Sequence, residues 1–156
     1  MFHTKDVLAN QLLANANDAS WYVPFTEAVQ GLSEEEANWK ADGESNSIAE
    51  IVNHLLYWNK TWQTRFLQGS IDAVPKVESN DSTFRAASAK PFHELQQLLL
   101  EVLLTWQDVL TEEKLQNSIP RLEGSRWWEA VGNVTTHNAY HIGQIVFIRK
   151  LRGSYI

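Results

Sequence analysis

The chain has 156 residues, of which 44% are hydrophobic and 21% charged, a composition typical of a soluble globular protein with a sizeable core. Its net charge of -6 argues against a nucleic-acid-binding protein, because phosphate backbones select for clustered Lys and Arg. No segment has the apolar run of a membrane-spanning helix or a signal peptide, so we expect a cytoplasmic protein without membrane contact that forms a single domain over residues 1–156.

The first region has apolar residues at helical spacing and predicts a helix over residues 4–30. Its apolar positions are Leu8, Leu12, Ala19, Tyr22 and Val29. Gly31 is the expected stop signal of this helix. The sequence Ser33-Glu34-Glu35-Glu36 then opens a short turn with a capping box, in which a Ser and the Glu three residues later each bond to the backbone N–H of the other.

A second long helix is predicted over residues 47–68, with Gly69 as its stop signal. Its apolar stripe consists of Ile48, Ile51, Leu55, Trp58 and Trp62. The residues that follow, 70–81, include Pro75 and indicate a long connection.

The third helix covers the apolar positions of residues 95–110, and its start is open. Pro91 suits a first helical turn, but residues 82–87 also have helical character, with Pro91 then forming a kink. A fourth helix is predicted over residues 126–151, with Gly153 as its C-cap. Four long helices, with one long connection between the second and the third, predict an all-α four-helix bundle.

Three of the five histidines lie on helix faces that we expect to point inward. Positions four apart on an α-helix differ by about 40° in direction and about 6 Å along the axis. His137 and His141 therefore project from one face, close enough to bind one ion. His54 lies between Ile51 and Leu55 on the apolar stripe of the second helix, and a bundle can bring this stripe and the histidine pair together.

The alternative is that these histidines are packing residues, which is the commoner role of a single buried His. Burying two neutral imidazoles together, however, costs desolvation that a cation would offset. The segment HNAYH lacks the Glu of the zinc-protease motif, and a di-iron bundle needs Glu-x-x-His pairs that this chain does not offer. We therefore predict a mononuclear site with three histidines and open positions, which suits one Zn, Ni or Fe ion per chain.

Two segments resemble the DinB-like family of small bacterial four-helix bundles: SIAEIVNHL, residues 47–55, and HNAYHIGQI, residues 137–145. The resemblance implies that His54, His137 and His141 bind a divalent metal ion. It also implies a homodimer and, through similarity to the better-understood relatives, a transferase that uses a low-molecular-weight thiol such as bacillithiol, mycothiol or glutathione. The absence of Cys fits a thiol supplied by a cosubstrate.

The expected function is thus the metal-dependent transfer of a low-molecular-weight thiol to a small-molecule substrate. A metal-dependent hydrolase and a non-catalytic, dimeric, stress-related metal-binding protein are the alternatives. No general acid or base is indicated by the sequence, so the catalytic residues other than the metal ligands stay unassigned.

Several neighbours of the histidines are expected to support the site. Gln144 lies one helical turn beyond His141 and is expected to face it, and Gly143 to permit the close approach of another helix. Trp58 is expected to fill the core, with a place in the wall of a pocket as the alternative. Candidates for orienting the imidazoles are Asn15, Glu50, Asn53 and Asn138. The residues expected to face a dimer partner are Ile142, Val146 and Phe147.

Overall fold

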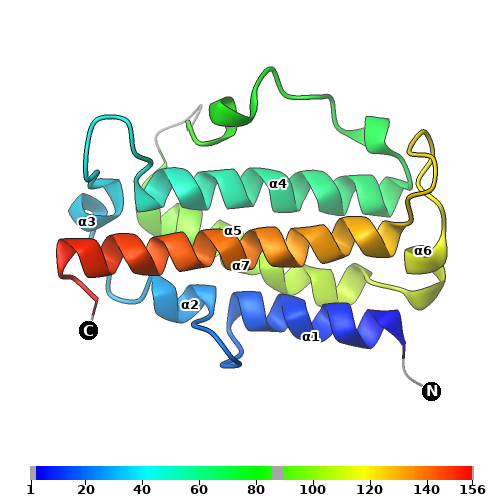
Figure 1. The fold of residues 1–156 in the computed structure, drawn as a ribbon, viewed down its shortest axis with the longest axis horizontal. Coiled ribbons are helices and arrows are strands. Elements are labelled where there is room, and N and C mark those ends of the chain that lie inside the picture. Colours follow the sequence, from blue (N-terminus) through cyan, green and yellow to red (C-terminus); the bar gives the residue numbers. More distant parts are fainter. Residues whose placement is uncertain (1–2, 86–89, 156) are drawn as a thin grey trace.

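Four long helices form a bundle in the computed structural model, which describes residues 3–85 and 90–155 (Figure 1). They are α1 (Thr4–Ala16), α4 (Ile48–Gln68), α5 (Phe92–Val109) and α7 (Trp127–Arg152). α4 packs against α5 and α7, and α1 packs against the same two helices. The predicted all-α four-helix bundle is confirmed. Within the described ranges, none of the helices combines the length and apolar character needed to cross a bilayer.

The connections between these helices carry short helical pieces. They are α2 (Phe25–Ala28), α3 (Glu34–Asn38), η1 (Ile71–Ala73), η2 (Asn80–Thr83) and α6 (Glu112–Gln116). The chain from residue 70 to residue 85, which we call the crossover segment, runs back along the outer side of α4 (Figure 1). As a result α4 and α5 point in the same direction, and the predicted long connection between them is confirmed.

The predicted helix over residues 4–30 is wrong in its second half, because α1 ends at Ala16. Asn17, at the C-cap, leaves the helical region with φ -150° and ψ 1°. Pro24 has no backbone N–H and disfavours a helical conformation in the residue before it. It serves instead as the N-cap residue of α2. Between the two helices the side chain of Trp21 is 99% exposed.

Both ends of α4 follow the signals in the sequence. At the start, Ser47 Oγ accepts from the backbone N–H of Glu50 at 3.2 Å, and the Glu50 carboxylate accepts from the Ser47 N–H at 2.8 Å. At the end, Gly69 adopts a left-handed conformation with φ 68°, which costs little only for glycine. The helix that carries His54 is therefore fixed at both termini.

The start of α5 is settled by Pro91, which is the N-cap residue rather than a kink within a longer helix. Of the alternative start over residues 82–87, Ser82 and Thr83 belong to η2, and residues 86–87 lie outside the described residues.

A buried polar cluster holds α4, α5 and α7 in register. The side-chain amides of Asn59 and Asn138 exchange hydrogen bonds of 2.7 and 3.1 Å, and the indole N–H of Trp106 donates to Asn59 Oδ1 at 3.1 Å. All three side chains are fully buried. Because α4 and α7 run antiparallel, this contact lies beside His54 and His137, and it fixes which turns of the two helices face each other.

Candidate metal centre

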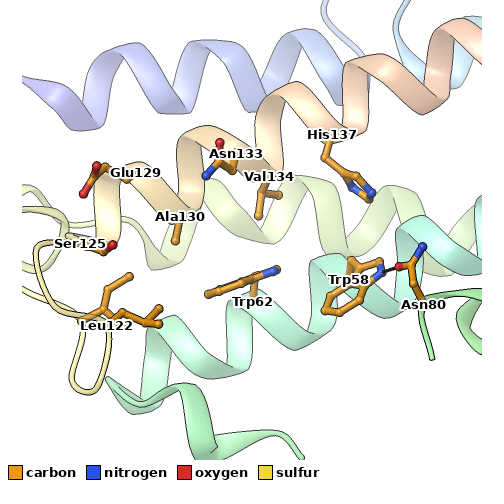
Figure 2. A pocket seen from close by; sticks show the side chains of 11 residues that line it. Trp58, Trp62, Asn80, Leu122, Ser125, Glu129, Ala130, Asn133, Val134 and His137 are labelled. Carbon is orange, nitrogen blue, oxygen red and sulfur yellow. Dashed lines mark hydrogen bonds between the residues drawn. The ribbon is translucent and has the colours of Figure 1, made fainter. Parts of the chain in front are cut away.

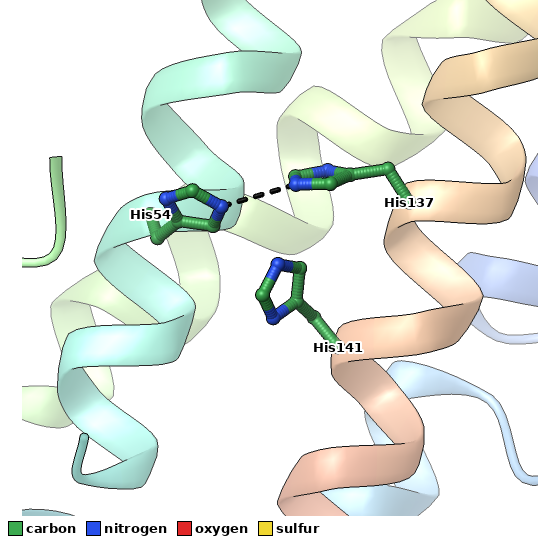
Figure 3. A group of neighbouring side chains, drawn as sticks. All are labelled: His54, His137 and His141. Carbon is green, nitrogen blue, oxygen red and sulfur yellow. Dashed lines mark hydrogen bonds between the residues drawn. The ribbon is translucent and has the colours of Figure 1, made fainter. Parts of the chain in front are cut away.

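His54 of α4 and the pair His137 and His141 of α7 converge between the two helices (Figure 3). Each offers one ring nitrogen, and these three atoms lie within 4.8 Å of one another. Among the described residues, no carboxylate and no further histidine joins this group. The structure thus brings together all three residues that the sequence singles out.

The spacing of the nitrogens suits a shared ion. His54 Nε2 and His137 Nε2 lie 3.0 Å apart, whereas two nitrogens bound to a tetrahedral Zn ion at its usual bond length lie about 3.3 Å apart. His54 is 1% exposed and His141 is 6% exposed, while His137 is partly exposed and forms the open edge of the group.

The crossover segment orients His54. Its Nδ1 lies 2.6 Å from Thr83 Oγ1, and the Thr83 hydroxyl donates its own proton to the Asn80 carbonyl at 2.6 Å. Thr83 Oγ1 therefore accepts from the Nδ1–H of His54, which leaves the Nε2 lone pair facing the other two histidines. Asn53 holds the Thr83 carbonyl at 2.9 Å, and the Phe84 ring stacks on His54 with centroids 3.9 Å apart.

Gln144 orients His141 in the same way. Its Oε1 lies 2.6 Å from His141 Nδ1, and an amide oxygen only accepts hydrogen bonds. The Nδ1–H of His141 is therefore the donor, and its Nε2 lone pair is free for the shared centre. The expectation that Gln144 faces the site is confirmed. Because its oxygen is used by His141, Gln144 is not a fourth ligand in this arrangement.

Burial keeps the histidines neutral. Burial, followed by the effect of His141 and His137, lowers the pKa of His54 to about 3. Burial, followed by the effect of His141, lowers the pKa of His137 to about 4. Burial also lowers the pKa of His141, and the hydrogen bond to Gln144 opposes this shift. At neutral pH all three imidazoles therefore have the protonation state that metal coordination requires.

A cavity of about 410 Å³ opens beside His137, between α4 and α7 (Figure 2). Trp58 and Trp62 form one wall, and the indole N–H of Trp58 donates to Asn80 Oδ1 at 3.2 Å. The other lining residues are Asn80, Ile119, Leu122, Ser125, Glu129, Ala130, Asn133 and Val134. Of the two roles expected for Trp58, core filling is wrong and the pocket wall is confirmed, since its side chain is only partly buried and borders this cavity.

A family model described as the DinB superfamily matches residues 10–145, a span that includes all three histidines. The chain belongs to the DinB superfamily. Searches of curated proteins and of solved structures gave no match. Membership of the DinB superfamily confirms the resemblance seen in the sequence, and the substrate has to be inferred from the site itself.

Three of the four residues considered for orienting the imidazoles have other roles in this DinB superfamily protein. Asn15 donates to the hydroxyl of Tyr22 at 2.6 Å, Glu50 belongs to the capping box of α4, and Asn138 pairs with Asn59. The remaining candidate, Asn53, acts only through the Thr83 carbonyl. Thr83 and Phe84 were missed because they reach His54 from a connection that the sequence marks only as polar and turn-rich.

Two expectations for α7 are also corrected in this DinB superfamily protein. Gly143 is exposed, and a Cβ placed on it has no neighbour within 4 Å, so no helix of the described residues approaches it closely. Ile142 is buried in the hydrophobic core and does not face a dimer partner, whereas Phe147 is 65% exposed. The reason is the helical period: positions 142 and 147 are five residues apart and point to different sides of α7.

Proposed function

We propose that this protein binds one divalent metal ion per chain through the Nε2 atoms of His54, His137 and His141. The observation that carries the proposal is the anchoring of two imidazoles at Nδ1, by Thr83 and Gln144, with their Nε2 atoms turned to a common centre. Zn, Ni and Fe ions all accept imidazole ligands. Three neutral donors leave the charge of such an ion uncompensated and favour an anionic ligand at an open position.

For the activity, we propose a transferase that uses a low-molecular-weight thiol as cosubstrate. When bound, the ion would supply a Lewis acid that lowers the pKa of a coordinating thiol. A hydrolase needs, in addition, a general base beside the ion, and no carboxylate of the described residues joins the histidine group. Because the chain has no Cys, the thiol must come from outside.

The cavity beside His137 supports a small-molecule substrate. Trp58 and Trp62 offer flat apolar faces to it. Asn80 accepts two hydrogen bonds here, one from the Trp58 indole N–H at its side-chain oxygen and one from the Thr83 hydroxyl at its backbone carbonyl. The same residue thus supports the wall of the cavity and the orientation of His54. We infer that these aromatic faces hold the electrophilic partner and keep water from the reacting sulfur.

We also propose that the protein is a homodimer that associates through α7. Tyr140, Phe147 and Leu151 are 64%, 65% and 57% exposed, and with the exposed Gly143 they follow one another at helical spacing on one face of α7. An exposed apolar row of this kind is typical of an interaction surface, and glycine in its middle leaves room for a close helix contact.

Elemental analysis of untagged protein tests the metal site. Wild type is expected to hold about one Zn, Ni or Fe per chain, His137→Ala none, and His93→Ala, which alters an exposed histidine, the same amount as wild type. Metal retained by His137→Ala, or no uptake by wild type after incubation with these three ions, would contradict the proposed site.

The activity is tested separately, by following the loss of free thiol from glutathione, bacillithiol or mycothiol in the presence of a chromogenic electrophile such as 1-chloro-2,4-dinitrobenzene. Metal-loaded wild type is expected to consume thiol faster than buffer that contains the same metal ion. His137→Ala in the presence of that ion should consume thiol no faster than the buffer. A fully loaded protein that consumes none of these thiols would favour the non-catalytic alternative.

A further inference from the structure

The crossover segment covers a second cavity, of about 440 Å³, against the C-terminal half of α4. Its walls include Trp58 and Trp62, which also border the cavity beside His137. The two cavities therefore adjoin at these indole rings. The other residues that line the second cavity are Tyr57, Arg65, Ile71, Asp72, Val74, Pro75, Lys76, Val77 and Leu122.

Arg65 brings a buried positive charge to this second cavity. The residue is 9% exposed. Its guanidinium lies 5.0 Å from the centroid of the Trp62 ring and donates one hydrogen bond, from Nη2 to the Val74 carbonyl at 3.1 Å. Its Nε–H is buried without a partner, and no carboxylate of the described residues lies within 4 Å of it. A buried cation without a counter-ion is costly, so the arrangement calls for an anion.

The lining of the second cavity contains a second cation and one carboxylate. Lys76 lines it and has no ion pair with any described residue. Asp72 is the acidic residue of the lining, and its carboxylate is already engaged by Arg121 at 2.7 Å. Arg149, the other well-buried arginine, also has a buried Nε–H without a partner, but both of its terminal nitrogens donate to backbone carbonyls, whereas Arg65 donates from Nη2 alone.

We propose that the second cavity binds a carboxylate-bearing organic anion. The carboxylate would meet the free side of the Arg65 guanidinium and the Lys76 ammonium, since the arginine fork matches a carboxylate. The apolar body of the ligand would lie against Trp58 and Trp62. The assignment of this anion to the substrate or to the thiol rests on the proposed function. Arg65 follows His54 by three turns of α4, about 16 Å along the axis, so a molecule that reaches both is an extended one.

Two probes of nearly the same shape, benzoate with a charged carboxylate and benzamide with a neutral amide, test the site by calorimetry on metal-free protein. Benzoate is expected to bind wild type at least tenfold more tightly than benzamide does. Arg65→Gln should weaken benzoate binding at least tenfold and Lys76→Gln severalfold. Lys60→Gln, which removes an exposed charge of α4 outside the cavity, should leave it unchanged. Equal affinity for the two probes, or for benzoate in wild type and Arg65→Gln, would overturn the proposal.

Arg65 also fastens the crossover segment at Val74, so circular dichroism must show that the Arg65→Gln variant is folded. If it is not, ¹H–¹⁵N spectra of the wild type replace it. The Nε–H resonance of Arg65 is identified as the one that is missing from the spectrum of Arg65→Lys. It should shift when benzoate is added and stay in place with benzamide. A resonance that shifts with neither probe would refute the site. These measurements are made without metal, so a failure to bind benzoate says nothing about the histidine centre. Conversely, His137→Ala should lose the metal and still bind benzoate.

Discussion

At the scale of single residues, the neighbours of the imidazoles decide what the site presents. A threonine hydroxyl can either accept or donate a hydrogen bond. The Thr83 hydroxyl already donates its proton to the Asn80 carbonyl, so it can only accept from His54. Gln144 imposes the same tautomer on His141. Partners of this kind usually change metal affinity by about 10- to 100-fold when they are removed.

Thr83→Val removes the hydroxyl but keeps the shape of the side chain. We expect it to weaken Zn binding by about tenfold or more, because His54 loses the acceptor that fixes its tautomer. Thr83→Ser keeps the hydroxyl and should bind Zn as wild type does. Competition with a chromophoric chelator measures both affinities. Equal affinities of Thr83→Val and wild type would show that Thr83 is only a packing residue.

The depressed histidine pKa values make the stability of the metal-free protein depend on pH. Folded His54 and His137 titrate near 3 and 4, whereas in the unfolded chain they titrate near 6.5. Below about pH 6.5 the unfolded chain therefore binds more protons, and the free energy of unfolding falls as the pH falls towards 4. Each histidine contributes at most about 1.4 kcal/mol per pH unit in this window.

Urea denaturation of the metal-free protein between pH 4.5 and 8 measures this dependence. His137→Ala should reduce the slope below pH 6.5, while the exposed His93→Ala should keep it. A free energy of unfolding that is flat between pH 7 and pH 5 in the wild type would contradict the burial of neutral imidazoles.

The group of three histidines and the position of Gln144 were predictable from sequence, and the supporting residues of the crossover segment were not. His137 and His141 are linked by the helical period, and His54 stands out on an apolar stripe. Thr83 is 29 residues from His54, in a connection whose path depends on tertiary packing. The contact between Gln144 and His141 was predictable because the two residues lie one turn apart on the same helix.

At the scale of secondary-structure elements, the sequence predicted the helices best where capping residues stand at both ends. Ser47 and Gly69 bound α4, and Gly153 closes α7 in a left-handed conformation with φ 78°. α1 was predicted too long because its helical spacing seemed to continue past Asn17. The short α6 was missed, although Thr111 caps it through its hydroxyl, because five helical residues carry too little periodicity to detect.

The Asn59 cluster yields a prediction about how the elements are held. Asn59→Leu should lower the free energy of unfolding by about 2–4 kcal/mol, since it leaves the buried Trp106 N–H and the Asn138 amide without their partner. Asn10→Leu makes the same change at an exposed position of α1 and should cost less than about 0.5 kcal/mol. Urea denaturation compares the two. A similar cost for both variants would mean that the buried amides do not contribute to stability.

At the scale of the whole molecule, the exposed row on α7 predicts the oligomeric state. Wild type is expected to sediment as a dimer, and Phe147→Glu as a monomer, because it places a charge in the centre of the apolar row. Lys60→Glu on α4 is the control and should stay dimeric. Sedimentation velocity over a range of concentrations makes the measurement. A wild type that is monomeric at every concentration would contradict the proposal that the row on α7 is a dimer interface.

The crossover segment divides the chain between the two sides of the proposed metal centre. Everything before it, α1 to α4, contributes one imidazole, and everything after it contributes two. A protease that cut the exposed backbone at Pro75 or Lys76 would therefore yield two fragments, neither of which carries the full set of nitrogens. The hydrophobic core and the Asn59 cluster would still join the two fragments, and the proposed ion would add one more link between them, so a chelator should make the nicked protein easier to dissociate in urea than the intact chain.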